Sequence, residues 1–253
     1  CHSEANGIYM IKTQSIHLFQ IFWKLYDILK IVIKRKNILK IAIDSPAAAG
    51  AGTLAKAVSK HYNLFYLDTG KIYRFVANLK IRHPKKFNDK FISKKIKSLK
   101  MKDLSNKSLL SNKVATVASV VAKEKKIRKI VYNFQVECAH NPPKKYSGSC
   151  LDGRDITYNI IPDADFKFFI TANVKTRALR RFKELKKFSK NITFNEVLKS
   201  IKNRDKSDYE RKISPLKKTK DSLLISTTNL TKRACFLKIK KIIDRKLQIN
   251  GNL

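Results

Sequence analysis

A short apolar strand leads into a loop of small residues and then into a helix in the stretch Ile41-Ala42-Ile43-Asp44-Ser45-Pro46-Ala47-Ala48-Ala49-Gly50-Ala51-Gly52-Thr53-Leu54. Small side chains let the backbone curl until successive N–H groups point at one anion, and the helix that begins near Thr53 adds the positive end of its dipole. The usual phosphate-binding pattern has glycine first and lysine near the end, whereas this chain has Ser45 and Ala51 there. The stretch therefore predicts a phosphate-binding loop without its lysine, or else a plain strand, turn and alanine-rich helix start with no ligand.

Length and charge narrow the class of protein. The chain has 253 residues, 43% of them hydrophobic, so we expect one sizeable α/β domain with inserted pieces. Its formal net charge of +37 indicates anionic partners, meaning nucleotides, nucleic acid or acidic membrane lipid. Lysines supply most of that charge and are spread along the whole chain, so a solvated surface is the alternative explanation. The four cysteines form no CxxC pair, which indicates a reducing cytoplasm.

The first 37 residues differ from the rest of the chain. Apolar side chains recur at helical spacing from Ile16 to Val32, which predicts an amphipathic helix in an N-terminal extension. Lys24 and Asp27 interrupt it, so no segment approaches the ~20 apolar residues that a membrane span needs. The extension lacks the features of a secretory signal, and Met10 is a candidate start of translation. We expect an appendage that packs on the domain, with a basic helix at a membrane surface as the alternative.

From Asn37 onward short apolar strands alternate with helices, a pattern typical of a parallel sheet covered on both faces. In such a doubly wound sheet ligands bind beyond the carboxyl ends of the strands, where the loop around Gly50 lies. The predicted strands are Lys40–Asp44, Leu64–Leu67, Ser149–Asp152, Phe166–Thr171 and Ser222–Ser226. The predicted helices are Thr53–Tyr62, Thr69–Leu79, Val114–Cys138, Val174–Lys187, Phe194–Asp205 and Leu230–Leu247, with one or two short surface helices in the Lys-rich stretch His83–Lys107.

Two polar clusters follow the ends of predicted strands. After the second strand comes the segment Tyr66–Arg74, in which Asp68 or Thr69 can cap the next helix. After the third strand comes Asp152-Gly153-Arg154-Asp155, where a guanidinium can grip phosphate oxygens in a bidentate fork. An ordinary turn stapled by an arginine–aspartate pair is the alternative for either cluster.

Arginine is the informative residue in a chain so rich in lysine. Phosphoryl transfer needs alignment and charge neutralisation rather than covalent help from the protein. Several arginines that close from a mobile segment over a bound nucleotide would supply both, whereas a solvated helix face would use lysine as readily. Two groups recur late in the chain: Arg177, Arg180 and Arg181 at helical spacing, and Arg204, Asp205, Asp208 and Arg211 before Pro215.

In this order, the motifs resemble those of the bacterial cytidylate kinases, which are nucleoside monophosphate kinases with a P-loop fold. The resemblance runs from about Ile38 to Asp244. It rests on the segments Asp44–Thr53 with Leu54-Ala55-Lys56, Tyr66–Arg74, Ala118-Ser119 with Arg128, Asp152–Asp155 with Pro162-Asp163-Ala164, Arg177–Arg181, Ile201–Asp205, Arg211 with Pro215-Leu216, and Asp221.

The resemblance implies an α/β fold of the P-loop nucleoside monophosphate kinase type, with a five-stranded parallel sheet and helices on both faces. Residues 1–37 would form the N-terminal extension and residues 38–253 the kinase domain. The CMP-binding part would span about 68–148 and a short lid about 204–215. The stretch between Arg74 and Ser119 is short, which implies a reduced CMP-binding insertion.

The resemblance also implies transfer of the γ-phosphoryl group of ATP to CMP or dCMP, which gives CDP or dCDP and ADP. Mg²⁺ would be held mainly by the phosphates, with Thr53 nearby and no direct protein ligand. The catalytic residues would be Arg154, Arg204 and Arg211. ATP would be bound by Ser45, Pro46, Ala47, Ala48, Ala49, Gly50, Ala51, Gly52, Thr53 and Arg180. CMP would be bound by Asp68, Thr69, Arg74, Ser119, Arg128, Asp155 and Asp208.

The chain departs from the family pattern in three places. Ala51 replaces the lysine that bridges the β- and γ-phosphates, Ser45 replaces the first glycine, and Thr157-Tyr158-Asn159 replaces a glycine-containing turn. Losing a preorganised charge typically costs on the order of 10²–10³ in rate, so a nucleotide-binding protein without turnover is the first alternative. A basic RNA- or membrane-surface-binding protein, suggested by the charge of +37, is the second. The expected protein is a cytoplasmic, monomeric enzyme whose partners are small-molecule nucleotides, with no specific nucleic acid and no transmembrane span.

Overall fold

One parallel sheet organises the chain. The computed structural model describes residues 38–187 and 191–251. By its internal contacts the chain divides into Cys1–Ile38 and Leu39–Leu253, and the predicted N-terminal extension with Met10 lies outside the described residues. The strands of the described part are β1 (Leu39–Asp44), β2 (Leu64–Asp68), β3 (Gly148–Gly153), β4 (Phe166–Thr171) and β5 (Leu223–Ser226).

The strands are all parallel and lie in the order β2-β3-β1-β4-β5. This confirms the predicted five-stranded sheet, and each strand ends within one residue of its predicted bounds. Side chains alternate between the two faces because a strand has a period of two. In β1, Ile41 and Ile43 belong to one apolar cluster and Ala42 to another, and Cys150 and Leu151 divide in the same way in β3. The strands are therefore apolar on both sides, as a covered parallel sheet requires.

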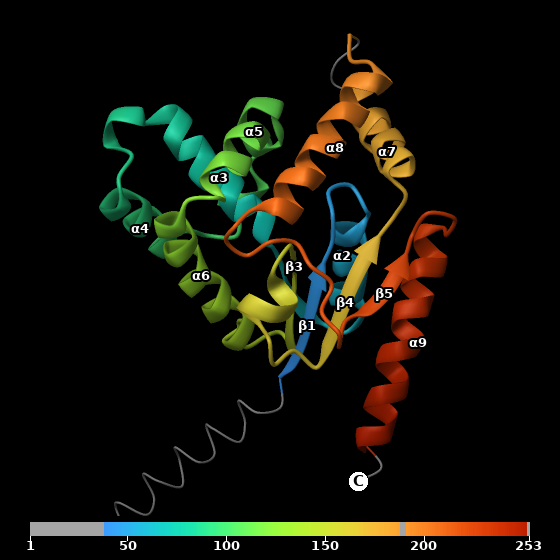
Figure 1. The fold of residues 1–253 in the computed structure, drawn as a ribbon. Helices are drawn as coiled ribbons and strands as arrows, with labels where there is room; N and C mark the ends of the chain where they lie inside the picture. The colour runs from blue at the N-terminus through green and yellow to red at the C-terminus, as the bar shows by residue number, and fades with distance from the viewer. Residues whose placement is uncertain (1–37, 188–190, 252–253) are drawn as a thin grey trace, which may run out of the picture. The chain divides into compact units, whose positions relative to one another are not determined.

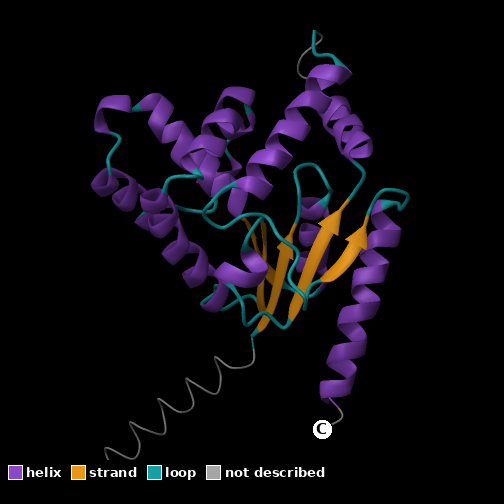
Figure 2. Ribbon diagram, in the orientation of Figure 1, coloured by secondary structure: helices purple, strands orange, loops and turns teal. Residues whose placement is uncertain are grey.

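Helices cover both faces of this sheet (Figure 1, Figure 2). On one face, α2 and α9 bury Val58 and Ile239, and on the other α3 and α6 bury Val76 and Val131. No helix in the described ranges is long and apolar enough to cross a membrane. The helices are α2 (Ala51–His61), α3 (Thr69–Arg82), α4 (Asp89–Lys97), α5 (Asn112–Val121), α6 (Lys125–His140), α7 (Val174–Lys186), α8 (Phe194–Glu210) and α9 (Lys232–Gly251).

Helices α7 and α8 pack side by side beyond the carboxyl ends of the strands (Figure 1). A capping box starts α8, because Thr193 and Glu196 each bond the other's backbone N–H. Val197 and Ile201, on the inner side of α8, pack with Ala47 in a third apolar cluster. The pair of helices is thereby attached to the loop that follows β1.

The Lys-rich stretch after α3 forms short helices, as predicted. It contains α4 and two 3₁₀ turns, Pro84–Lys86 and Asp103–Ser105. Ile92 and Ile96 of α4 are buried, and the lysines of this helix surround them on its outer side. The stretch therefore packs on the domain through a narrow apolar edge.

The structure differs from the predicted helices at several places. The single helix predicted over Val114–Cys138 is two helices, α5 and α6, separated by the turn Ala122-Lys123-Glu124. Arg128 Nη1 donates to the Ala122 carbonyl oxygen (3.2 Å) and so stabilises the bend, which no apolar periodicity could reveal. Three other helices extend past their predicted ends: α3 to Arg82, α8 to Glu210 and α9 to Gly251.

Candidate active site

The loop Ser45–Thr53 joins β1 to α2 at the carboxyl end of the sheet. Two of its residues have a left-handed backbone, with φ of +90° at Gly50 and +59° at Ala48. Glycine has no Cβ and adopts this conformation freely, whereas alanine is strained there. Helix α2 begins without a side-chain cap, so the N–H groups of its first turn are open to an anion. The backbone of this loop therefore suits an anionic ligand.

Helix α7 holds the loop from its carbonyl side. Arg177 Nη1 donates to Ala47 O (3.1 Å) and Arg180 Nη1 to Ala49 O (3.5 Å). Thr227, which follows β5, also donates its hydroxyl to Ala49 O (2.8 Å). Bonds to the carbonyl oxygens fix the curl of the loop and leave its inner N–H groups for a ligand.

The lysine position of the usual pattern carries a buried methyl group. Ala51 is 4% exposed and packs with Leu54 in the apolar cluster under α2. Lys56, one turn further along α2, has its Nζ 5.9 Å from the centre of the Tyr66 ring. The loop itself therefore provides backbone dipoles and no side-chain charge.

A cavity of about 350 Å³ lies beside the loop. Of the residues predicted to bind ATP, it brings together Ala48, Gly50, Thr53 and Arg180, and the remaining loop residues do not line it. Its other walls are Leu54, Arg181, Lys183, Glu184, Thr227, Leu230, Lys232 and Cys235.

A second cavity, of about 60 Å³, lies among α3, α5, the turn after β3 and α8. Asp68 does not line it, because its carboxylate caps α3 by accepting from Lys71 N (3.2 Å). The lining does include all three predicted catalytic arginines and the other predicted CMP-binding residues, namely Arg154, Arg204 and Arg211 with Thr69, Arg74, Ser119, Arg128, Asp155 and Asp208. Residues far apart in the sequence thus meet at one place.

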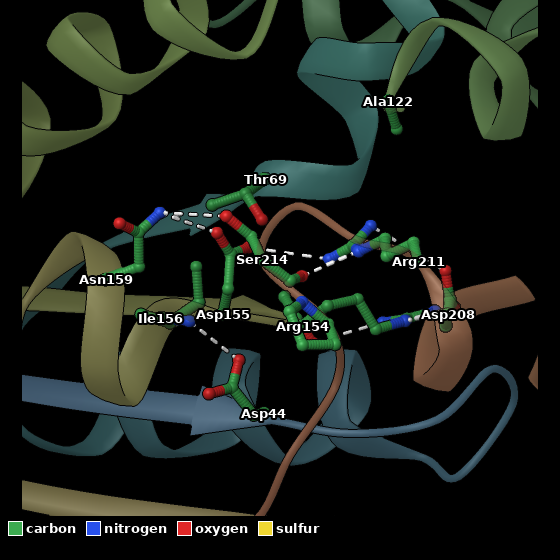
Figure 3. A network of polar contacts seen from close by, with 12 residues as sticks. Asp44, Thr69, Ala122, Arg154, Asp155, Ile156, Asn159, Asp208, Arg211 and Ser214 are labelled. Carbon is green, nitrogen blue, oxygen red and sulfur yellow. Dashed lines mark hydrogen bonds and ion pairs between the residues drawn. The ribbon is translucent and has the colours of Figure 1, made fainter. Parts of the chain in front are cut away.

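Ion pairs hold the charges of this cavity in position (Figure 3). Arg154 Nε donates to Asp208 Oδ2 (2.8 Å), which joins the turn after β3 to α8. Arg128 Nη2 is paired with Asp155 Oδ2, and both side chains are buried. Gly153, next to Arg154, cannot carry a side chain because a Cβ would lie 2.5 Å from Thr69 Oγ1. The turn that bears Arg154 and Asp155 is thus tightly packed against the start of α3.

Burial and neighbouring charges act in opposite directions on these groups. Burial would raise the pKa of Asp208, but the guanidinium groups of Arg154 and Arg204 lower it below its usual range. Burial would lower the pKa of Arg154, but the Asp208 carboxylate raises it. The pKa of Arg204 is lowered to about 10, by burial and by the nearby Arg154 charge. The charges of Arg154 and Asp208 therefore stabilise each other, whereas the charge of Arg204 is not fully compensated by nearby carboxylates.

Two buried guanidinium nitrogens in the cavity have no hydrogen-bond partner within the described chain: Arg204 Nε and Arg211 Nη2. Arg204 Nε lies 3.9 Å from Asp208 Oδ2, and Arg211 Nη2 lies 3.9 Å from Asp155 Oδ1. Buried cationic donors without partners are costly. Both nitrogens line the cavity and are available to an anion that enters it.

Asp44, the last residue of β1, fixes the turn that follows β3. Its buried carboxylate accepts from Ile156 N (2.8 Å), Thr157 N (2.9 Å) and Thr157 Oγ1 (2.6 Å), the first of which Figure 3 shows. Residues Ile156–Ile160 form one π-helical turn, a form frequent at functional sites. Burial raises the pKa of Asp44 to about 6. A single aspartate gives no sequence signal for partners this distant, so this role was missed.

Asp152 is the carboxylate nearest the start of α2. Its Oδ2 is 3.3 Å from the place that a Cβ on Gly52 would occupy, and its Oδ1 accepts from Tyr66 OH (3.0 Å). Burial and the Asp68 carboxylate raise the pKa of Asp152 to about 8. The described ranges contain no cluster of three His, Cys, Asp or Glu side chains that could hold a metal ion.

Asn159 and Arg177 have structural roles that the sequence motifs did not reveal. Asn159 Nδ2 donates to Asp155 Oδ2 (2.8 Å), and its i+4 spacing from that aspartate in a helical turn was the available signal. Arg177 is buried and makes two bonds to Asp205 of α8 (2.9 and 2.5 Å). It therefore anchors α8 to the loop rather than facing a ligand.

Sequence comparisons extend these observations. The family model described as cytidylate kinase matches residues 41–245. A cytidylate kinase of Bartonella tribocorum (strain CIP 105476 / IBS 506) is 42% identical over 205 residues, which cover 81% of this chain and 94% of that protein. One of Mesomycoplasma hyopneumoniae (strain 7448) is 35% identical over 222 residues, with 83% and 95% covered. One of Thermosipho melanesiensis (strain DSM 12029 / CIP 104789 / BI429) is 37% identical over 221 residues, with 83% and 99% covered. The chain belongs to the cytidylate kinase family.

Proposed function

We propose that this chain transfers the γ-phosphoryl group of ATP to CMP or dCMP, producing CDP or dCDP and ADP. The observation that carries the proposal is the cavity in which Arg154, Arg204 and Arg211 meet Asp155 and Asp208. A solvated basic surface would not require such convergence of buried, paired side chains. Family membership supports the same assignment.

The acceptor nucleotide would bind at the cavity around Asp155, which at about 60 Å³ has to widen by movement of α8 away from α3 and α5 to admit it. A carboxylate accepts hydrogen bonds, so Asp155 suits the exocyclic amine of cytosine better than the carbonyl oxygen of uracil at the same place. Asp208, held by Arg154, would accept from a sugar hydroxyl. Arg74, whose Nη1 donates to Leu109 O (2.8 Å), would face the phosphate of CMP.

The donor nucleotide would place its phosphates in the loop Ser45–Thr53 and the rest of the molecule in the 350 Å³ cavity. Arg180 lines this cavity and is fixed by bonds to Thr227 Oγ1 (2.8 Å) and Thr227 O (2.6 Å). Mg²⁺ would neutralise charge between the phosphates of bound ATP. The oxygen-bearing side chains near the loop fit that arrangement. Thr53 offers a hydroxyl at the start of α2, and Asp152 is the nearest carboxylate.

Transfer requires an oxygen of the CMP phosphate in line with the γ-phosphorus of ATP. As that oxygen bonds to phosphorus, the bond from phosphorus to the β–γ bridging oxygen breaks, and ADP leaves with the electron pair. Arg204 and Arg211 would neutralise charge on the moving group through the two nitrogens that have no partner. Arg204 lies on α8 and Arg211 directly follows it, so motion of α7 and α8 would bring both to the phosphates.

A second candidate follows from Ala51: a member of this fold that binds both nucleotides without transferring phosphate. The experiment is a Mg-ATP assay with CMP on the chain and on Ala51→Lys, together with CMP-binding calorimetry on both. We expect turnover in the chain itself, and a rise of on the order of 10²-fold in kcat for Ala51→Lys. If the chain binds both nucleotides without turnover and Ala51→Lys restores turnover, the second candidate is established. Failure to bind CMP would overturn both.

A further inference from the structure

The segment Arg211–Leu216, which we call the strap, follows α8 and closes on itself. Leu216 N donates to Asp208 O (2.7 Å), and Arg211 Nε donates to Ser214 O (2.6 Å). Ser214 has a φ of +51°, in the left-handed region where serine is strained. A strained backbone persists only where its surroundings hold it, so the strap needs an external attachment.

The turn after β3 provides that attachment (Figure 3). Asn159 Nδ2 donates to Ser214 Oγ (3.4 Å) and to Asp155 Oδ2 (2.8 Å). The neighbouring Tyr158 donates its hydroxyl to Pro215 O. Two adjacent residues of the turn thus bond two adjacent residues of the strap.

The two oxygens of Asp155 are used unequally. Arg128 Nη2 and Asn159 Nδ2 both donate to Oδ2. Oδ1 lies 3.9 Å from Arg211 Nη2, a nitrogen without a hydrogen-bond partner in the described part of the chain. The bond from Asn159 therefore keeps Oδ2 occupied and leaves Oδ1 beside Arg211.

The fold of the turn does not depend on the Asn159 amide. Asp44 already holds the turn through three bonds to Ile156 and Thr157. The Asn159 amide instead connects the turn to Asp155 and to the strap. Loss of this amide should therefore loosen the strap while the domain stays folded.

We propose that Asn159 is a positioning residue, which holds the strap through Ser214 and the carboxylate of Asp155, so that Arg211 presents Nη2 to the cavity. This inference rests on the proposed function, because it concerns how Arg211 reaches the transferring phosphoryl group. It links the carboxylate that would contact the pyrimidine to the arginine that would contact the phosphoryl group. A nucleotide that binds to Asp155 then meets Arg211 already aligned.

The first test compares Asn159→Leu, which keeps the size of the side chain and removes the amide, with the wild-type chain. We expect kcat to fall about tenfold and the KM for CMP to rise about threefold, as for the loss of hydrogen bonds to a charged group and to a hydroxyl. The KM for ATP should stay within about twofold of the wild-type value, because the substitution does not touch the loop Ser45–Thr53. The matched control is Thr219→Val, which removes a hydroxyl bond to Ser222 beyond the strap and should change none of these constants. Unchanged kcat in Asn159→Leu, or an equal fall in the control, would overturn the inference.

The second test changes the charge at position 159. Asn159→Asp keeps the shape of the side chain, but replaces the amide donor by a second carboxylate beside Asp155. We expect kcat to fall at least as far as in Asn159→Leu, because the donor is lost and a like charge is added. A kcat equal to that of the wild type would contradict a positioning role for the amide.

The third test does not need catalysis. Amide hydrogen exchange at Leu216 in the nucleotide-free chain reports whether the strap is closed. We expect exchange about tenfold faster in Asn159→Leu than in the wild type, and unchanged in Thr219→Val. If the wild-type chain fails to phosphorylate CMP, the proposed function falls, while the exchange rates still decide whether Asn159 holds the strap. Equal exchange in Asn159→Leu and the wild type would overturn the inference whatever the activity.

Discussion

The loop Ser45–Thr53 and the cavity around Asp155 offer an anion different groups to bind. The cavity is lined by charged side chains that pair with one another, such as Arg154 with Asp208. The loop contains no charged side chain. The arginines that reach it come from α7 and bond to its carbonyl oxygens, which leaves the backbone N–H groups as its means of binding an anion.

This difference shows that arginines near one active site do different work. Arg177 and Arg128 are buried in ion pairs and hold elements together. Arg204 and Arg211 retain nitrogens without a hydrogen-bond partner within the described residues. Removing an arginine of the first kind should cost stability, and removing one of the second kind should cost activity. The loop should respond instead to changes in backbone conformation.

The largest effect is expected for Arg204→Gln. Its kcat should fall on the order of 10²–10³ because a charge at the transferring group is lost, while the free energy of unfolding stays the same or rises slightly. The lowered pKa of Arg204 shows that the folded chain does not stabilise its charge. Steady-state kinetics and urea denaturation check both parts. The control is Lys202→Gln, an exposed position of the same helix, for which neither quantity should change. A loss of stability in Arg204→Gln that matches its loss of activity would break the distinction.

Arg177→Met should lower the free energy of unfolding by about 3 kcal/mol, because it leaves Asp205 without its partner in a nearly buried site. Urea denaturation followed by circular dichroism measures this change. Arg181→Met is the control on the same helix, since the partner of Arg181 is the exposed Glu184. Pairs of that kind contribute about 0.2–1 kcal/mol. Similar losses in the two variants would show that Arg177 is not an anchor.

Stability should depend on pH through Asp152. Its pKa in the folded chain is raised by burial from 3.8 to about 8, so the folded state binds this proton more tightly than the unfolded state. The free energy of unfolding should therefore decrease as pH rises from about 4 to about 8. Between pH 6 and pH 8 this decrease should amount to about 2 kcal/mol in the wild-type chain, and Asp152→Asn should not show it. Urea denaturation of the nucleotide-free proteins at several pH values measures the two slopes. Parallel curves would exclude a raised pKa at Asp152.

The smallest effect concerns the loop backbone. Ala48→Gly should raise the free energy of unfolding by about 0.5–1 kcal/mol, because glycine adopts the φ of +59° without strain. Ala49→Gly is the control: Ala49 is not among the left-handed residues, so this substitution should lower stability through unfolded-state entropy. Thermal unfolding of both variants compares them. A loss of stability in Ala48→Gly would mean that contacts of the Ala48 methyl group outweigh the strain.

The sheet could be predicted from sequence because its strands are short apolar runs bounded by polar residues. The break between α5 and α6 could not, since it depends on a bond from Arg128 to the Ala122 carbonyl oxygen. The helical spacing of apolar residues continues through this bend, so the sequence pattern does not reveal it.

The candidate site likewise contains residues that the sequence predicted and residues that it did not. Arginines and aspartates in ordered motifs identified most of the residues that line the cavity around Asp155. Asp44, Asn159 and Ser214 were missed because their partners are distant in the sequence and because a left-handed serine has the same letter as any other serine.

Asp44 has a consequence for how far apart two bound nucleotides can be. Its backbone leads directly into the loop at Ser45, and its carboxylate binds the turn that carries Asp155. Asp44 thereby ties the loop proposed to hold ATP to the turn proposed to contact CMP. Under the proposed function, the distance between the two nucleotides would change through movement of α3, α5, α7 and α8, while Asp44 keeps the ends of the strands together.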